Sequence, residues 1–353
     1  MKNAFYDAHS KMIIENYLRM LCLIKFTTGL YLYHEGWKKI DYKKHLKKLS
    51  GVPVLFILGN GVILYSMMTC KHKYAYLVCF FQSLRYAHLL AKVRSLAAES
   101  DRAYQNGPLE RTFYQEASLR PEEEDVDINL SSFQLPSQYT SRLDWFAFNL
   151  EGEHSAMDGA ILEEHTEYVV YAIHKIWDQY KVSYDAGTRE SVAVSGSLPK
   201  SVILVGHSMG GFVAKAAIIH PRLRKSAVET VLTLSTPHQY VYFQLSPPVA
   251  LQASLGHYFA RANSEWIKGY KVQTTNTGHY VSDPVLSHVV VVSISSAYND
   301  YQVRSKLTSP DNIVPPTHGF MISSTAMKNV WLSMEHQAIL WCNQLVVQVS
   351  HTS

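Results

Sequence analysis

Short apolar runs alternate with longer amphipathic stretches along most of the chain. Five runs rich in Val, Ile, Leu and Phe predict strands, at residues 52–58, 144–150, 201–206, 227–235 and 287–295. Several of them are continuously apolar, which is typical of parallel strands covered on both faces. The stretch at 159–180 instead repeats its apolar positions with the period of an amphipathic helix. This alternation predicts βαβ units and an α/β fold with a mostly parallel sheet and helices on both faces.

Composition agrees with a large globular domain. The chain has 353 residues, of which 47% are hydrophobic and 18% charged, enough to build a sizeable core. The formal net charge is +4, and its only dense basic stretch, residues 37–51, reads as a solvated face or, as a second option, a membrane-headgroup contact. No aromatic stacking platform or nucleic-acid motif accompanies this stretch, so nucleic acid is excluded as an expected partner.

The four cysteines show no CxxC spacing and no metal-type cluster, so cysteine usage is uninformative. At the N-terminus, Lys25 interrupts the best apolar run, which falls short of the roughly 20 apolar residues of a membrane span. Its beginning also lacks the form of a signal peptide. We therefore divide the chain into an atypical N-terminal segment, residues 1–29, and one α/β domain, residues 30–353.

Residues 206–210 read Gly-His-Ser-Met-Gly, the G-x-S-x-G pattern of a nucleophile elbow. An apolar strand precedes the pattern and a small-residue helix follows it, which is the context that the elbow requires. A tight turn of this kind strains the serine backbone and exposes its hydroxyl above the sheet. The pattern predicts that Ser208 is a nucleophile and that the Met209 amide is one donor of an oxyanion hole.

A serine nucleophile needs a base and an orienting acid, in the chain order serine, acid, histidine for this fold. Asp300 comes directly after an apolar strand and is the favoured acid, with Asp311 as the competitor. His336 precedes an amphipathic terminal helix and is the favoured base. The alternative base, His318, lies in a Pro-flanked loop and could line the pocket instead.

Four further residues are expected to bind substrate. His207 and His238 lie beside the elbow and after the next strand, but both precede any acid in the chain, so the order disfavours them as the base. Phe243 and Phe259 belong to an aromatic-rich stretch, residues 240–266, that could form an apolar groove or cap for an acyl chain. Ordinary helix packing is the competing interpretation of that stretch.

At this point the sequence resembles a known family. Residues 206–239, 298–305 and 333–346 are similar to the lumenal catalytic domain of the GPI inositol-deacylases (the PGAP1-like family), and the likeness extends over roughly 30–60 and nearly everything from 93 onward. The resemblance implies an α/β-hydrolase fold and an endoplasmic-reticulum membrane location, with the domain in the lumen. It implies removal of the acyl chain from the inositol of GPI anchors through an acyl-enzyme, without metal or cofactor. The expected partners are GPI-anchored proteins, acyl-inositol lipid and the membrane surface.

Carried over by residue, the resemblance makes Ser208 the nucleophile, Asp300 the acid and His336 the base. By position, an amide at Asn60 or Gly61, in the loop after the first strand, is the second oxyanion donor. Family members continue from that loop through a short Gly- and Ser-containing turn.

This chain departs from the family pattern in three places. Residues 62–92 stand where the short turn is expected and resemble an insertion, and residues 240–245 resemble a second, smaller one. The membrane spans of the family are not seen. The first insertion predicts a chain that folds but is a weak hydrolase. The alternatives are a general lipase or esterase, and a catalytically impaired isoform that keeps the fold.

Overall fold

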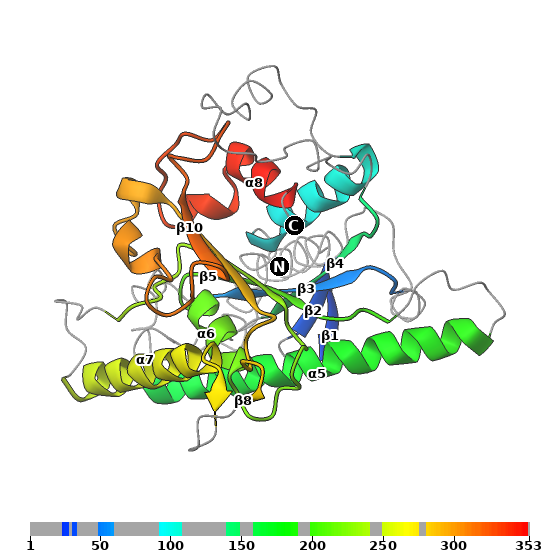
Figure 1. Cartoon of the computed structure of the whole chain (residues 1–353). Coiled ribbons are helices and arrows are strands. Elements are labelled where there is room, and N and C mark those ends of the chain that lie inside the picture. Colours follow the sequence, from blue (N-terminus) through cyan, green and yellow to red (C-terminus); the bar gives the residue numbers. More distant parts are fainter. Residues whose placement is uncertain are drawn as a thin grey trace, which may run out of the picture.

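A computed structural model describes residues 23–27, 30–33, 49–59, 92–107, 139–148, 158–189, 198–240, 249–274 and 280–351. Its centre is an eight-stranded sheet in the order β1-β2-β4-β3-β5-β6-β9-β10 (Figure 1). Strand β2 runs antiparallel to β1 and β4, and the other neighbours are parallel. The strands are β1 Leu23–Thr27, β2 Leu30–Tyr33, β3 Val52–Leu58, β4 Leu143–Phe148, β5 Ile203–His207, β6 Thr230–Leu234, β9 Val290–Ser295 and β10 Gly319–Ser323. Strands β7 Gln273–Thr274 and β8 Tyr280–Ser282 pair separately.

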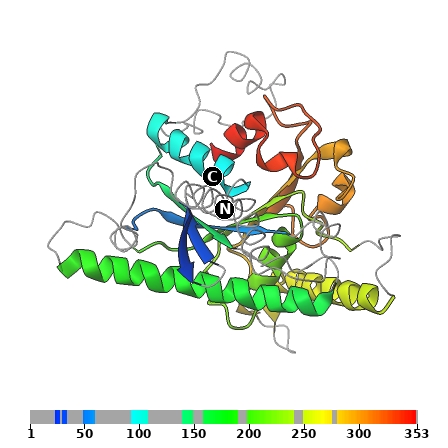
Figure 2. The ribbon, with the colours of Figure 1, turned by 180° about the vertical axis from the view of Figure 1, so that it is seen from behind.

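Helices cover both faces of the sheet (Figures 1 and 2). On one face lie α5 Gly159–Arg189, α6 Met209–Ile218 and α7 Val249–Gly269. A helix at residues 92–106 and α8 Asn343–Ser350 lie on the other. Three short 3-10 helices, η3 Ala297–Asn299, η4 Ser305–Thr308 and η5 Ala338–Leu340, lie in the connections after β9 and before α8.

Two apolar clusters follow from this layering, because alternate side chains of a strand point to opposite faces. Leu55 and Ile57 of β3 pack with the α5 and α6 side, whereas Phe56 between them packs with the helix at 92–106 and with α8. Strand β3 is buried along nearly its whole length, as its continuous apolar run predicts.

The sheet confirms the predicted fold class. Strand β4 lies between β2 and β3, so β3 and not β4 is the neighbour of β5. The chain then turns from β5 directly into α6, as in an α/β hydrolase. All five predicted strands are present; the ends of β3 coincide with the prediction, and those of the others differ by at most three residues. Strands β1, β2 and β10 were not predicted, and β1 lies within the 1–29 segment that the sequence set apart. Among the described residues, no helix has the length and apolar character that crossing a membrane requires.

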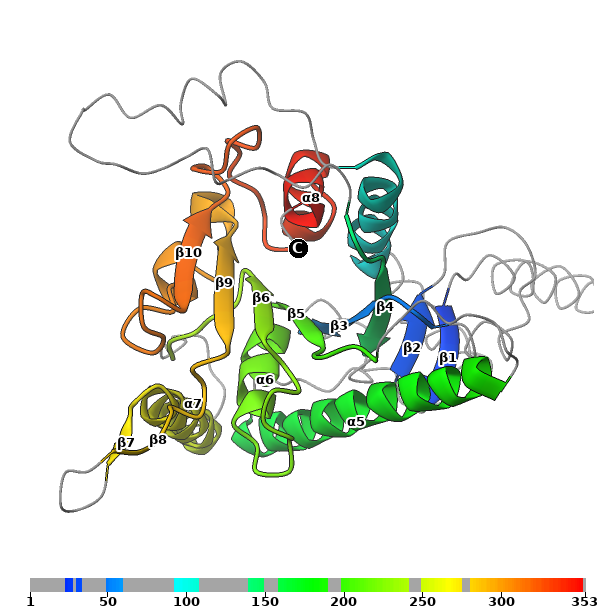
Figure 3. The same cartoon turned by 45° about the vertical axis from the view of Figure 1, so that its right-hand side comes forward.

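The carboxyl ends of the parallel neighbours β5, β6 and β9 lie side by side (Figure 3). A backbone ladder continues past the strands there, since Ser208 N donates to Leu234 O and Ser235 N donates to Ile294 O. In open α/β sheets, ligands bind at the carboxyl ends of the strands.

Candidate active site

Ser208 lies in the sharp turn between β5 and α6. Its φ of 56° and ψ of −134° fall outside the regions that L-residues ordinarily occupy. The turn is tight enough to require glycine at positions 206 and 210, before and after Ser208. A Cβ at Gly210, for example, would collide with the carbonyl oxygen of Ile57. Ser208 stands at the N-terminus of α6, where the helix dipole favours developing negative charge. Strained backbone at a strand end of this kind is characteristic of functional sites.

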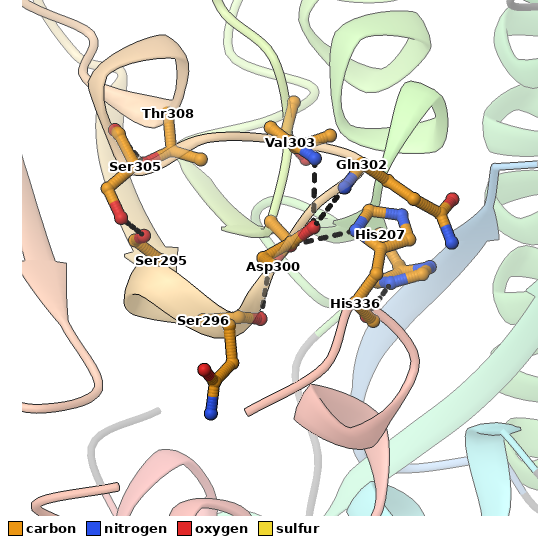
Figure 4. A network of polar contacts seen from close by, with 12 residues as sticks. His207, Ser295, Ser296, Asp300, Gln302, Val303, Ser305, Thr308 and His336 are labelled. Atoms are coloured by element: carbon orange, nitrogen blue, oxygen red, sulfur yellow. Dashed lines mark hydrogen bonds and ion pairs between the residues drawn. The ribbon is translucent and has the colours of Figure 1, made fainter. Parts of the chain in front are cut away.

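Asp300 and His336 form a buried pair. Asp300 Oδ2 lies 2.9 Å from His336 Nδ1, and the side chains are 0% and 2% exposed, respectively (Figure 4). The other carboxylate oxygen of Asp300 accepts hydrogen bonds from the amides of Gln302 at 3.0 Å and Val303 at 2.8 Å. These amides hold the carboxylate in one orientation, so the ring of His336 is oriented in turn.

The pairing with Asp300 leaves Nε2 of His336 as the ring atom that can accept a proton. Within the described part of the chain, this buried nitrogen has no hydrogen-bond partner. Ser208 is 8% exposed, and no hydrogen bond of its hydroxyl occurs among the same residues. In structures without substrate, catalytic hydrogen bonds are often long and tighten only when substrate binds. The geometry is therefore that of a buried histidine whose Nδ1 is held by a carboxylate, and whose ring centroid lies 4.7 Å from that of His207, the residue before Ser208.

The two alternative residues lie elsewhere. His318 lies at the amino ends of the parallel strands, directly before β10, whereas Ser208 lies at their carboxyl ends. There its Nε2 contacts the carbonyl oxygen of Ser287 at 2.9 Å. Asp311 is exposed, and its amide bonds to the hydroxyl of Ser309. The structure brings neither residue to the elbow.

The loop after β3 reaches the elbow at Gly59. Its amide donates to the carbonyl oxygen of His207 at 2.9 Å, and a Cβ on Gly59 would lie only 2.6 Å from the Met209 amide nitrogen. The predicted donors Asn60 and Gly61 follow immediately but lie outside the described residues, as do residues 62–91 of the suspected insertion. The sequence places Gly59 in the same loop as the predicted donors, where glycines allow a close approach of the backbone, but does not name it as a site residue.

The residues expected to bind substrate are placed differently. Phe259, on α7, is 3% exposed and stacks on Phe212 of α6 with ring centroids 3.7 Å apart. The structure thus corrects the expectation that Phe259 lines an open groove: α7 packs against α5 and places this ring on Phe212 of α6. His207 and His238 are wholly buried and make protein contacts. Phe243 lies outside the described residues.

His238 belongs to a buried polar group behind the elbow. Lys215 of α6 is fully buried; its Nζ donates to Asn263 Oδ1 at 2.8 Å, and Asn263 Nδ2 donates to the carbonyl oxygen of His238 at 3.0 Å. Burial lowers the pKa of Lys215 to about 7. Burial, together with the nearby Lys215 charge, lowers the pKa of His238 well below its ordinary value. Burial therefore shifts both groups toward their neutral forms.

Sequence reasoning also missed the contacts that brace the acid loop. Ser333 accepts a hydrogen bond at its hydroxyl from the Asn299 amide at 2.7 Å, and the Met334 amide donates to the Ser296 carbonyl oxygen at 2.9 Å. These bonds join the loop that carries Asp300 to the loop that carries His336. Among the described residues, no group of three or more His, Cys, Asp or Glu side chains is placed to hold a metal ion.

Comparisons with known proteins point to one family. Residues 88–353 match the family model of the PGAP1-like alpha/beta domain. The chain is 30% identical over 316 residues to a GPI inositol-deacylase of Chaetomium globosum and 31% identical over 316 residues to one of Neurospora crassa. It is 28% identical over 345 residues to the GPI inositol-deacylase A of Yarrowia lipolytica.

These matches cover 90%, 90% and 92% of this chain, but only 22%, 20% and 29% of the respective relatives. The chain thus spans less than a third of the length of the curated relatives it matches. The family model, in contrast, includes Ser208, Asp300 and His336 within its matched range. The chain belongs to the PGAP1-like alpha/beta domain family.

Proposed function

We propose that this domain is a serine hydrolase that removes the acyl chain from the inositol of GPI anchors. Ser208 is the nucleophile, His336 the general base and Asp300 the acid that orients it. Support comes from one observation above all: the buried Asp300–His336 pair, with Nδ1 held at 2.9 Å, places the histidine ring 4.7 Å, between centroids, from the ring of His207, the residue before Ser208. The names of the curated relatives supply the substrate class.

The reaction proceeds through two acyl transfers. Ser208 Oγ attacks the acyl carbonyl carbon while its proton passes to His336 Nε2. The bond to the inositol oxygen then breaks, and that oxygen takes the proton from His336. Water attacks the acyl-enzyme with His336 again as base, which releases the fatty acid and restores Ser208.

Developing negative charge on the carbonyl oxygen requires donors. The Met209 amide, at the start of α6, is one proposed donor, and the fold family supplies the second from the loop after β3, here Asn60 or Gly61. The position of Gly59 beside the Met209 amide supports this assignment, because it brings that loop to the elbow.

Fatty-acid release from an inositol-acylated GPI lipid in detergent micelles tests the proposal. The wild-type chain should release fatty acid, and Ser208→Ala should abolish release. Ser226→Ala is the matched control, since Ser226 also has a left-handed φ of 63° but lies exposed in the loop after α6. Hydrolysis of short-chain esters without turnover of the acyl-inositol lipid would instead favour a general esterase. Loss of both activities in the wild-type chain would favour a catalytically impaired isoform.

A membrane surface is the proposed partner of the site's outer rim. Four exposed side chains, three of them aromatic, form this rim: Tyr298 and Tyr301, which flank Asp300, and Trp331 and Leu332, which precede His336. The bonds between Asn299 and Ser333 hold the two loops together. Tyr and Trp combine an apolar ring with a polar group, and so they suit the headgroup level of a bilayer.

Trp331 supports this orientation further. It is 63% exposed and has a φ of 43°, so an unfavourable backbone conformation presents a large apolar side chain to the outside. Arg304 and Lys306, both exposed, lie just beyond Tyr301 and would favour anionic lipid. Placement in the lumen of the endoplasmic reticulum stays an expectation from the family, which fractionation and protease protection of the tagged protein would test.

A further inference from the structure

His207 joins the strand that carries the nucleophile to the loop that carries the base. It is the last residue of β5, and its side chain is wholly buried. Its Nε2 lies 2.9 Å from the carbonyl oxygen of His336, and the centroids of the two rings are 4.7 Å apart (Figure 4). Since a carbonyl oxygen can only accept, Nε2 of His207 carries the hydrogen and donates it.

Asp300 alone does not fix the position of the base. Its carboxylate determines which way the His336 ring turns, through the bond to Nδ1. The ring also moves with the main chain from which it extends, and residues 331–337 form no helix or strand. The bond from the Met334 amide to the Ser296 carbonyl oxygen holds this segment two residues earlier. The His207 bond holds it at the base itself.

We infer that His207 is a positioning residue, whose Nε2–H holds the main chain of His336 so that the ring faces Ser208. The inference rests on the proposed function and replaces the expected contact of His207 with substrate. Because His207 directly precedes Ser208, its hydrogen bond sets the place of the base relative to the backbone of the nucleophile. A displacement of about 1 Å in such a group costs on the order of 100-fold in rate.

Two substitutions separate the hydrogen bond from ring packing. His207→Gln can place an amide N–H near the position of Nε2, whereas His207→Phe fills the same space without a donor. His318→Phe is the matched control. Nε2 of His318 also contacts a main-chain carbonyl oxygen at 2.9 Å, but at the amino ends of the parallel strands. If His207 had a merely structural role, the loss of activity would follow the loss of stability in the same way in all three variants.

The experiment measures kcat and KM on a soluble short-chain ester, together with Tm and the rate at which a fluorophosphonate labels Ser208. For His207→Phe we expect kcat and labelling to fall about 10- to 100-fold, with KM within about 2-fold of wild type. His207→Gln should recover most of this loss, and His318→Phe should lower Tm without lowering kcat. Unchanged kcat in His207→Phe, or equal losses in the Phe and Gln variants, would overturn the inference.

A second measurement keeps the inference testable if His207→Phe fails to fold. Nitrogen-15 NMR of histidine-labelled wild-type protein should show a hydrogen on Nε2 of His207; a hydrogen on Nδ1 alone would contradict the inference. Absence of Ser208 labelling in wild type would overturn the proposed function itself, and the inference with it. Normal wild-type labelling with an unaffected Phe variant would overturn the inference alone.

Discussion

The amide of Gly59 donates a hydrogen bond to the carbonyl oxygen of His207, 2.9 Å away, and so ties the loop after β3 to the residue before the nucleophile. This contact allows no side chain at position 59, because a Cβ would lie 2.6 Å from the Met209 nitrogen and 2.8 Å from the Gly210 nitrogen. The close approach of two backbones is the physical reason for glycine there.

Gly59→Ala should therefore displace the loop from the elbow. We expect turnover of a soluble ester to fall about 100- to 1000-fold, the usual cost of losing one preorganised oxyanion donor. Gly256→Ala on α7 is the control, since its Cβ would meet only ring carbons of the Tyr240 side chain, at 3.0, 3.3 and 3.5 Å, and no backbone atom. Activity of Gly59→Ala within about 2-fold of that control would show that this loop takes no part in the site.

The suspected insertion makes a separate prediction. Replacing residues 62–92 by a short Gly- and Ser-containing turn should raise turnover of acyl-inositol lipid about 100- to 1000-fold, because the loop would then aim its amide at the substrate. Equal rates for the shortened and unmodified chains would mean that these residues are harmless to catalysis. Circular dichroism and Tm of both chains serve as the control for folding.

Loss of the Trp331 side chain should affect only substrate that lies in a membrane. Trp331→Asn keeps a residue that tolerates a positive φ, so the loop should retain its shape. Turnover of acyl-inositol lipid in anionic vesicles should fall about tenfold, with soluble-ester kcat/KM unchanged. Tyr168→Ser removes another exposed aromatic ring, 55% exposed, from α5 and should change neither rate. Parallel losses on vesicles and soluble ester in Trp331→Asn would contradict a membrane-facing rim.

Lys215 makes stability depend on pH. Its folded pKa of about 7 lies below the ordinary value of 10.5, so between these values the unfolded chain binds a proton that the folded chain does not. The contribution of Lys215 to the free energy of unfolding therefore rises with pH over that window. Relative to Lys215→Met, the wild-type protein should gain about 2 kcal/mol between pH 7.5 and 9.5.

Urea unfolding of both proteins across this pH range measures the difference, and groups common to both, such as the buried tyrosines, cancel. A constant difference between the two proteins from pH 7.5 to 9.5 would show that Lys215 stays charged, held by Asn263 and by the faces of Phe212 and Trp266.

The elbow could be predicted because its pattern lies within five consecutive residues. The acid and the base could be predicted because they follow the serine in a fixed order along the chain. The spacing around Ser208 requires small residues, and Asp300 follows a strand that is apolar enough to recognise. Strand β10 escaped prediction because its residues Gly319–Ser323 are an edge strand with an exposed Phe320 and Met321, and so lack a continuous apolar run.

Phe259 and His207 show what an apolar or polar pattern cannot decide. An aromatic residue on an amphipathic helix fits a groove or a core equally well, and only the stacking on Phe212 distinguishes them. For His207, the motif leaves its position open to any residue. Its partner, the carbonyl oxygen of His336, is 129 positions away in the chain, so no local signal could assign it.

Covalent labelling of Ser208 tests the central claim most directly. Intact-mass analysis after reaction with a fluorophosphonate, followed by peptide mapping, reports both the site and the rate of attack. A serine activated by the buried pair should be labelled once per chain, at Ser208, and His336→Ala or Asp300→Asn should slow labelling by about 1000-fold or more. Asp311→Asn should leave the rate unchanged. Labelling at another residue, or an equal rate at Ser208 in His336→Ala, would contradict the assignment of Ser208, His336 and Asp300 as one catalytic unit.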